Sequence, residues 1–118
     1  MAGRDESSWT SAADLAGRIR RRELSPVELM TSTIQRIERR NKSLNAFVFT
    51  DFDQAMDRAR AAEAAVTSGN TLGPLHGVPT AMKDLFDFKP GWPATFGGIR
   101  ALRDQVIDAL VDWAHAHP

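Results

Sequence analysis

The sequence predicts an α/β chain in which two or three helices precede the first strands of an incomplete sheet. Two serines that can cap helices, Ser11 and Ser25, are each followed by apolar residues at helical spacing. Residues 46–50 are a short apolar run rich in β-formers, and residues 80–86 are a second apolar run, interrupted by charge. The helical spacing predicts the helices, and the two runs predict the strands.

Two helix starts can be placed by their capping residues. Ser11 is followed three positions on by an acid, which is typical of a first helical turn. At the second start, Ser25 can cap the free amides, Pro26 fits the first turn and Glu28 can reach back to Ser25. The first helix has apolar residues at helical spacing: Leu15, Ala16 and Ile19. The second should bury a stripe at steps of three and four: Val27, Met30, Ile34 and Ile37.

The rest of the chain alternates helical patterns with turn-rich segments. An alanine-rich third helix should end at residues 68–70. Its inner face is Ala55, Ala59, Ala62 and Val66. Turn chemistry follows at 73–79 and an extended loop at 88–98. A last helix is indicated by Leu102, Val106, Ala109, Leu110 and Trp113.

Composition excludes several classes of function. Fifteen Lys plus Arg balance 15 Asp plus Glu, so no net charge draws the chain to nucleic acid or to an acidic membrane. The absence of cysteine excludes a disulfide framework, a thiolate nucleophile and cysteine-ligated metals. No run approaches the roughly 18 apolar residues of a membrane helix, and residues 1–8 lack the apolar core of a signal peptide. We therefore expect a cytoplasmic chain without nucleic-acid or membrane partners.

Lys83 is the clearest candidate for a catalytic residue. It lies between Met82 and Leu85 in a segment that is otherwise apolar. Taking an ammonium out of water disfavours its charged form, and a neutral lysine can serve as a general base. Alternatively, Lys83 ends an edge strand, extends into solvent and pairs loosely with Asp84. The residues alone leave both interpretations open.

A longer stretch gives Lys83 a context. Gly73-Pro74-Leu75-His76-Gly77-Val78-Pro79-Thr80-Ala81-Met82-Lys83-Asp84 resembles the Gly-Pro-Leu-His-Gly-Val-Pro-x-Ala-x-Lys-Asp stretch of the amidase signature family. Three further segments resemble the N-terminal portion of such enzymes, at residues 25–29, 44–47 and 91–98. The resemblance covers about residues 11–104. We therefore divide the chain into a flexible tail (1–10), this family portion (11–104) and a divergent helical tail (105–118).

The resemblance implies a fold and a chemistry. The fold is the mixed-sheet amidase signature fold, of which this chain would hold the N-terminal helices and the first strands. The reaction is hydrolysis of a small carboxamide to a carboxylate plus ammonia or an amine, without a metal or organic cofactor. A serine nucleophile, a bridging serine in a cis peptide bond and a lysine base carry it out. Lys83 stands where the family's lysine stands, and its neutral amine would accept a proton from the bridging serine.

The family's two serines have no counterpart in these 118 residues. In the family they lie, with the oxyanion-hole amides, in a glycine- and serine-rich segment. The serines of this chain lie instead in the tail, at caps, on helices or in loops: Ser7, Ser8, Ser11, Ser25, Ser32, Ser43 and Ser68. The resemblance fades from about Gln105, and Gly97-Gly98 replaces a common Gly-Ser pair. We expect a truncated amidase that is inactive alone, with Lys83 as its one catalytic residue.

Other features are interpreted structurally. His76 should be a turn residue whose ring bonds to the backbone. A basic cluster is expected to be a solvated helix face: Arg18, Arg20, Arg21 and Arg22. Three residues near the C-terminus are not expected to hold a metal: Asp112, His115 and His117.

Two alternative functions remain. The first two helices carry an apolar stripe that could pair with a second copy, giving a non-catalytic homodimer. A component of a tRNA-linked glutamine amidotransferase, which belongs to the same family, is another possibility. The sequence Lys83-Asp84-Leu85 followed by Phe86 is more similar to the general amidases.

Overall fold

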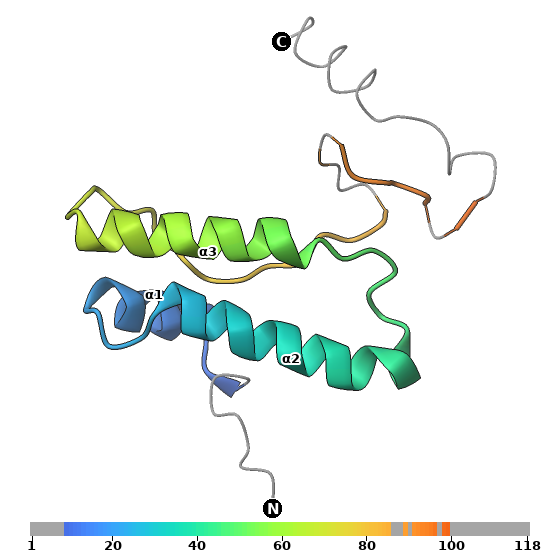
Figure 1. Ribbon diagram of the computed structural model, residues 1–118, viewed down its shortest axis with the longest axis horizontal. Coiled ribbons are helices and arrows are strands. Elements are labelled where there is room, and N and C mark those ends of the chain that lie inside the picture. Colours follow the sequence, from blue (N-terminus) through green and yellow to red (C-terminus); the bar gives the residue numbers. More distant parts are fainter. Residues whose placement is uncertain (1–8, 86–88, 90, 97, 100–118) are drawn as a thin grey trace, which may run out of the picture. The chain divides into compact units, whose positions relative to one another are not determined.

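The computed structural model describes residues 9–85, 89, 91–96, 98 and 99, and the chain divides into two compact units between Pro79 and Thr80. Three helices form the first unit: α1 (Ala12–Arg20), α2 (Pro26–Leu44) and α3 (Phe52–Thr67). Figure 1 shows α2 and α3 side by side in opposite directions, with α1 beside the start of α2. The expected helix at 102–113, the tail at 105–118 and residues 1–8 lie outside the described residues.

Both predicted helix starts are confirmed. The Asp14 N–H donates to Ser11 Oγ at 3.1 Å, and the Val27 and Glu28 N–H groups donate to Ser25 Oγ at 3.0 and 3.2 Å. Glu63 of α3, and not Glu28, is the carboxylate to which the Ser25 hydroxyl donates. Ser25 therefore begins α2 and ties that end of the helix to α3. Among the described helices, none combines the length and the apolar character that a bilayer crossing requires.

The core of the helical unit draws on all three helices. Its buried members are Leu15, Ile19, Leu29 and Val66, with the partly buried Leu24, Leu72 and Val78 packed against them. Burial of the α1 face and of Ala59 and Val66 on α3 agrees with the expected apolar faces.

The buried face of α2 differs from the prediction. Leu29 and Pro26 are buried, whereas the expected stripe at positions 27, 30, 34 and 37 is half-buried. Leu29 belongs to the same cluster as the α1 residues Leu15 and Ile19, so the first turns of α2 bury the face that α1 covers. Periodicity shows that a face is apolar, but the neighbouring elements decide which part of it is covered.

Neither expected strand is present in the described residues. At residues 46–50, the side chain of Asn41 occupies both backbone polar groups of Phe47: its Nδ2 donates to the Phe47 carbonyl and its Oδ1 accepts the Phe47 N–H, each at 2.8 Å. Those groups are then not offered to a strand ladder. Residues 80–83 are exposed and run in no regular element. The described structure is thus helical, and the sheet expected from the sequence is not part of it.

The basic cluster is not simply a solvated face. Arg22 donates to the Val66 and Thr67 carbonyls at 3.1 and 3.3 Å, and Arg20 donates to the Gly73 carbonyl at 3.2 Å. Carbonyls at the end of a helix lack intrahelical partners, so the two Arg22 bonds help to satisfy the C-terminal end of α3. Arg20 instead binds the segment that follows α3.

Arg21 has a different, local partner. It forms two hydrogen bonds with the Glu23 carboxylate, at 2.7 and 2.9 Å. The hydrogen bond from Arg21 lowers the pKa of Glu23. Both side chains are at least half exposed, so solvent screens the pair and it contributes little to stability.

The turn at 73–79 packs on the core through Gly77. Its φ is +78°, and a Cβ built there would lie 3.0 Å from Pro26 Cγ and 3.2 Å from Ile19 Cδ1. Both the backbone conformation and the space therefore favour glycine. The neighbouring His76 places Nε2 2.9 Å from the Ala62 carbonyl, which confirms that it is a turn residue bound to the backbone.

We expect Gly77→Ala to lower the free energy of unfolding of the helical unit by about 1–3 kcal/mol. Chemical denaturation followed by far-ultraviolet circular dichroism measures the loss. Gly69→Ala is the matched control, because Gly69 also has positive φ (+72°) but nothing within 4 Å of its added Cβ. Gly77→Ala should cost more than Gly69→Ala. Equal losses would show that the approach to Ile19 and Pro26 contributes nothing.

Arg22→Ala should lower the free energy of unfolding by about 1–2 kcal/mol, because it removes the Nη2 group that donates to both carbonyls at the end of α3. The same denaturation experiment measures it. Arg21→Ala, which breaks the exposed pair with Glu23, should cause a smaller loss. If the two losses were the same, the carbonyl contacts of Arg22 would not stabilise the unit.

Candidate active-site segment around Lys83

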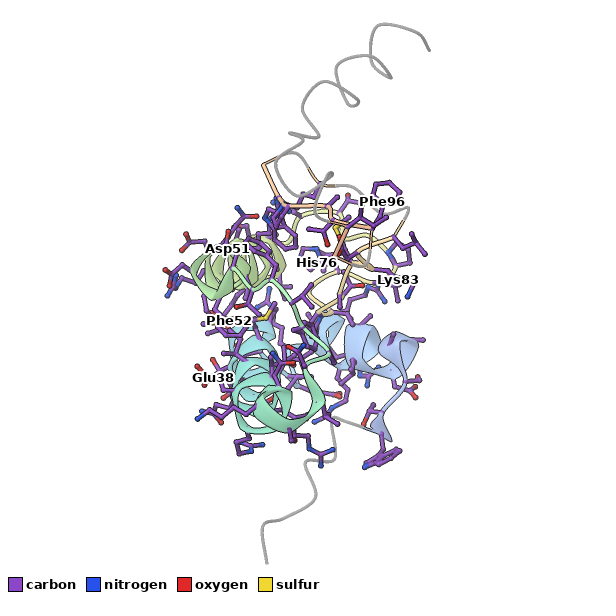
Figure 2. All side chains as sticks on the ribbon, turned by 90° about the vertical axis from the view of Figure 1, so that its right-hand side faces the viewer. Glu38, Asp51, Phe52, His76, Lys83 and Phe96 are labelled. Atoms are coloured by element: carbon purple, nitrogen blue, oxygen red, sulfur yellow. The ribbon has the colours of Figure 1, made fainter. Side chains whose placement is uncertain are left out.

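Lys83 lies in the second unit, in a segment without regular secondary structure, and is labelled in Figure 2. Residues 80–83 are exposed, and a turn follows at Asp84 and Leu85. The burial that the sequence led us to expect around Lys83 is therefore not seen. Its physical reason is the missing strand: without a paired sheet over it, the segment has nothing among the described residues that takes the lysine out of water.

The neighbouring carboxylate of Asp84 is bound to Thr95. The Thr95 N–H donates to Asp84 Oδ1 at 2.6 Å, and the Thr95 hydroxyl donates to Asp84 Oδ2. Asp84 and Thr95 are half-buried, and Ala94 beside Thr95 is 7% exposed. Two hydrogen bonds thus join Asp84 to Thr95 across eleven residues. We call this contact the Asp84–Thr95 clasp.

Thr95 also orders the residues that follow it. Its Oγ1 accepts the Gly98 N–H at 2.9 Å, and its carbonyl accepts the Ile99 N–H at 2.9 Å. Its hydroxyl therefore donates to Asp84 while it accepts from Gly98. One side chain connects the residue after Lys83 with the described end of the 91–99 loop.

A second contact shapes the same loop. Lys89 Nζ lies 3.7 Å from the centroid of the Trp92 ring, and the Trp92 N–H donates to the Lys89 carbonyl at 3.0 Å. This is a cation–π contact beside a turn. Sequence reasoning missed both this contact and the clasp. Spacing could have suggested the first, because it is local, but nothing in the sequence pairs residue 84 with residue 95.

The described serines cap helices or donate to helix carbonyls. Ser11 and Ser25 cap α1 and α2, Ser68 ends α3, and Ser32 and Ser43 donate to helix carbonyls at 3.0 and 3.1 Å. Ser25 has a carboxylate partner in Glu63, but its oxygen accepts two backbone N–H groups. Its lone pairs are therefore engaged in the cap, and it does not resemble an activated nucleophile.

Among the described residues, no group of three or more His, Asp or Glu side chains is placed to hold a metal ion. Asp112, His115 and His117 lie outside those residues. The segment at 80–85 carries one amine, that of Lys83, and one carboxylate, that of Asp84 beside it.

Comparison with known proteins identifies the family. The family model described as Amidase matches residues 28–109, which is more than half of the chain, and the chain belongs to this family. A solved bacterial aryl acylamidase of the amidase signature family is 48% identical with a TM-score of 0.76, over 83% of this chain and 20% of that one.

Curated relatives carry two kinds of name. The acylamidase of Rhodococcus erythropolis is 40% identical over 89 residues, which are 75% of this chain and 18% of the relative. A glutamyl-tRNA(Gln) amidotransferase subunit of Aromatoleum aromaticum is 46% identical over 76 residues, which are 64% of this chain and 15% of the relative. The chain therefore spans less than a fifth of these curated relatives.

Proposed function

We propose that this chain supplies the lysine-bearing N-terminal part of a C–N hydrolase that acts on small carboxamides, with Lys83 as its general base. The observation that carries the proposal is the position of Lys83 inside the 28–109 match to the amidase family. The acylamidase and aryl acylamidase relatives favour an acyl amide as the substrate class. The cytoplasmic location expected from the sequence stays a prediction.

The proposed chemistry needs Lys83 as a neutral amine. It would accept a proton from a bridging serine, which in turn accepts the proton of the nucleophilic serine as the latter attacks the amide carbonyl. Both serines would have to come from a segment that the 118 residues do not include. The exposure of Lys83 is compatible with this role, because an exposed amine is accessible to partner groups.

The 118-residue chain alone should not hydrolyse a chromogenic aryl acylamide. A base without nucleophile or oxyanion donors supplies a small part of the required acceleration, about 10²–10⁴-fold at most. A hybrid tests the base directly: this chain replaces the matching 20% of the aryl acylamidase. Lys83→Ala should lower the hybrid's kcat by about 10²–10⁴-fold.

Lys42→Ala is the control for the hybrid, because Lys42 is an exposed lysine of α2. It should leave kcat unchanged. Undiminished activity of the Lys83→Ala hybrid would reject the proposed base. Turnover by the isolated chain that Lys83→Ala abolishes would reject its inactivity.

A second proposal, non-catalytic self-association, is favoured by apolar exposure on the helical unit. Leu44 and Val48, at and after the end of α2, are 65% and 68% exposed. Exposed large apolar side chains are candidates for a contact surface. Light scattering after size exclusion should show a dimer that Val48→Asp converts to a monomer. A monomeric mass for the unsubstituted chain would contradict this proposal.

A further inference from the structure

The side chain of Asn41 binds a residue six positions further along the chain. Its Nδ2 donates to the Phe47 carbonyl and its Oδ1 accepts the Phe47 N–H, each at 2.8 Å. A hydrogen-bonded residue pair in an antiparallel sheet exchanges two bonds of the same kind. The Asn41 amide thus takes the place that a residue of a neighbouring strand would take at Phe47.

Asn41 also takes part in the end of the helix that carries it. Its backbone carbonyl accepts the Asn45 N–H at 2.8 Å, and Asn45 has a φ of 48°, so the chain leaves α2 through a left-handed residue. Asparagine adopts this conformation more readily than most residues. After this turn Phe47 lies against the Asn41 side chain, and residues 45–51 run in no regular element.

The segment held in this way has the composition of a strand that pairs with copies of itself. Residues 44–50 include no charged residue, proline or glycine, and residues 46–50 are rich in β-formers. Phe47, Val48 and Phe49 are 36%, 68% and 41% exposed. Two copies of an uncharged segment do not repel each other, and their exposed apolar side chains can pack together. The same segment of a second copy is therefore a well-matched partner.

We propose that Asn41 is a latch: by occupying both backbone polar groups of Phe47, it keeps residues 46–50 from pairing as a strand with the same segment of a second copy. Natural proteins protect exposed strand edges by several devices that prevent such pairing. Here the protection is one amide side chain of the preceding helix. The latch controls backbone pairing, whereas the self-association proposed above uses apolar side chains, and it does not depend on the role of Lys83.

Asn41→Ala in the complete chain tests the latch. Alanine removes both side-chain bonds to Phe47, yet it is the best helix former, so α2 is not weakened at that position. Hydrogen exchange of the Phe47 amide should become about tenfold faster or more, the scale of two lost hydrogen bonds. Thioflavin T fluorescence and the infrared amide I band report intermolecular β-structure. This β signal should rise with protein concentration in Asn41→Ala and stay at background in the unsubstituted chain.

Two further variants separate the latch from a general loss of stability. Gly77→Ala strains the helical unit elsewhere and keeps the bonds from Asn41 to Phe47, so at a matched fraction of folded protein it should give no β signal. Val48→Lys, added to Asn41→Ala, places a charge on the exposed segment. It should abolish the β signal while exchange at the Phe47 amide stays fast.

Faster exchange at Phe47 without a β signal would overturn the inference, as would a β signal of equal size in Gly77→Ala. An unchanged Phe47 rate would overturn it as well, because the bonds from Asn41 would then not hold the segment. The dimer proposed above can fail separately. A monomeric unsubstituted chain together with a β signal in Asn41→Ala would reject the dimer and retain the latch. A dimer that Val48→Asp disrupts, together with no β signal in Asn41→Ala, would reject the latch alone.

Discussion

Arg22 makes the contact that joins the end of α1 to the end of α3. Its backbone has a φ of 60°, and the N–H groups of Arg22 and Glu23 bond back to the Ile19 and Arg18 carbonyls, which ends α1. Glycine is the usual residue at such a position because the left-handed conformation costs other residues about 1–2 kcal/mol. The Arg22 side chain reaches the last carbonyls of α3. One residue thus connects the end of α1 with the end of α3.

Bonds from side chains to backbone carbonyls also hold the segment after α3, which has no regular secondary structure. Three side chains bond to backbone carbonyls in or next to this segment. Arg22 bonds at the end of α3, Arg20 at the Gly73 carbonyl, and His76 at the Ala62 carbonyl. Gly77 then admits the close approach of Ile19 that completes the core. An irregular segment can be well positioned when side chains satisfy backbone groups that a helix or a sheet would otherwise satisfy.

Contacts between residues close in the sequence could be predicted, whereas contacts between distant residues could not. Helix starts at Ser11 and Ser25 were predictable because a cap and its amides lie within three residues. The bond from Arg22 to Val66 spans 44 residues, and that from Thr95 to Asp84 spans eleven, so no local pattern contains them. Lys83 was found through resemblance to a family stretch. Its surroundings were not, because the pairing of a strand depends on a second segment and cannot be seen in the apolar run itself.

The family stretch at 73–84 is divided by the fold. Residues 73–79 end the helical unit, where Gly77 and His76 serve packing and backbone bonds, whereas Thr80 begins the second unit. Similarity along such a stretch therefore reflects two kinds of constraint. Changes in its first half alter the free energy of unfolding, because they act on the core. Lys83 and Asp84 belong to the other unit, and under the proposed function changes at Lys83 would act on the base. On that proposal, a motif that is uniform in sequence combines a structural half with a chemical half.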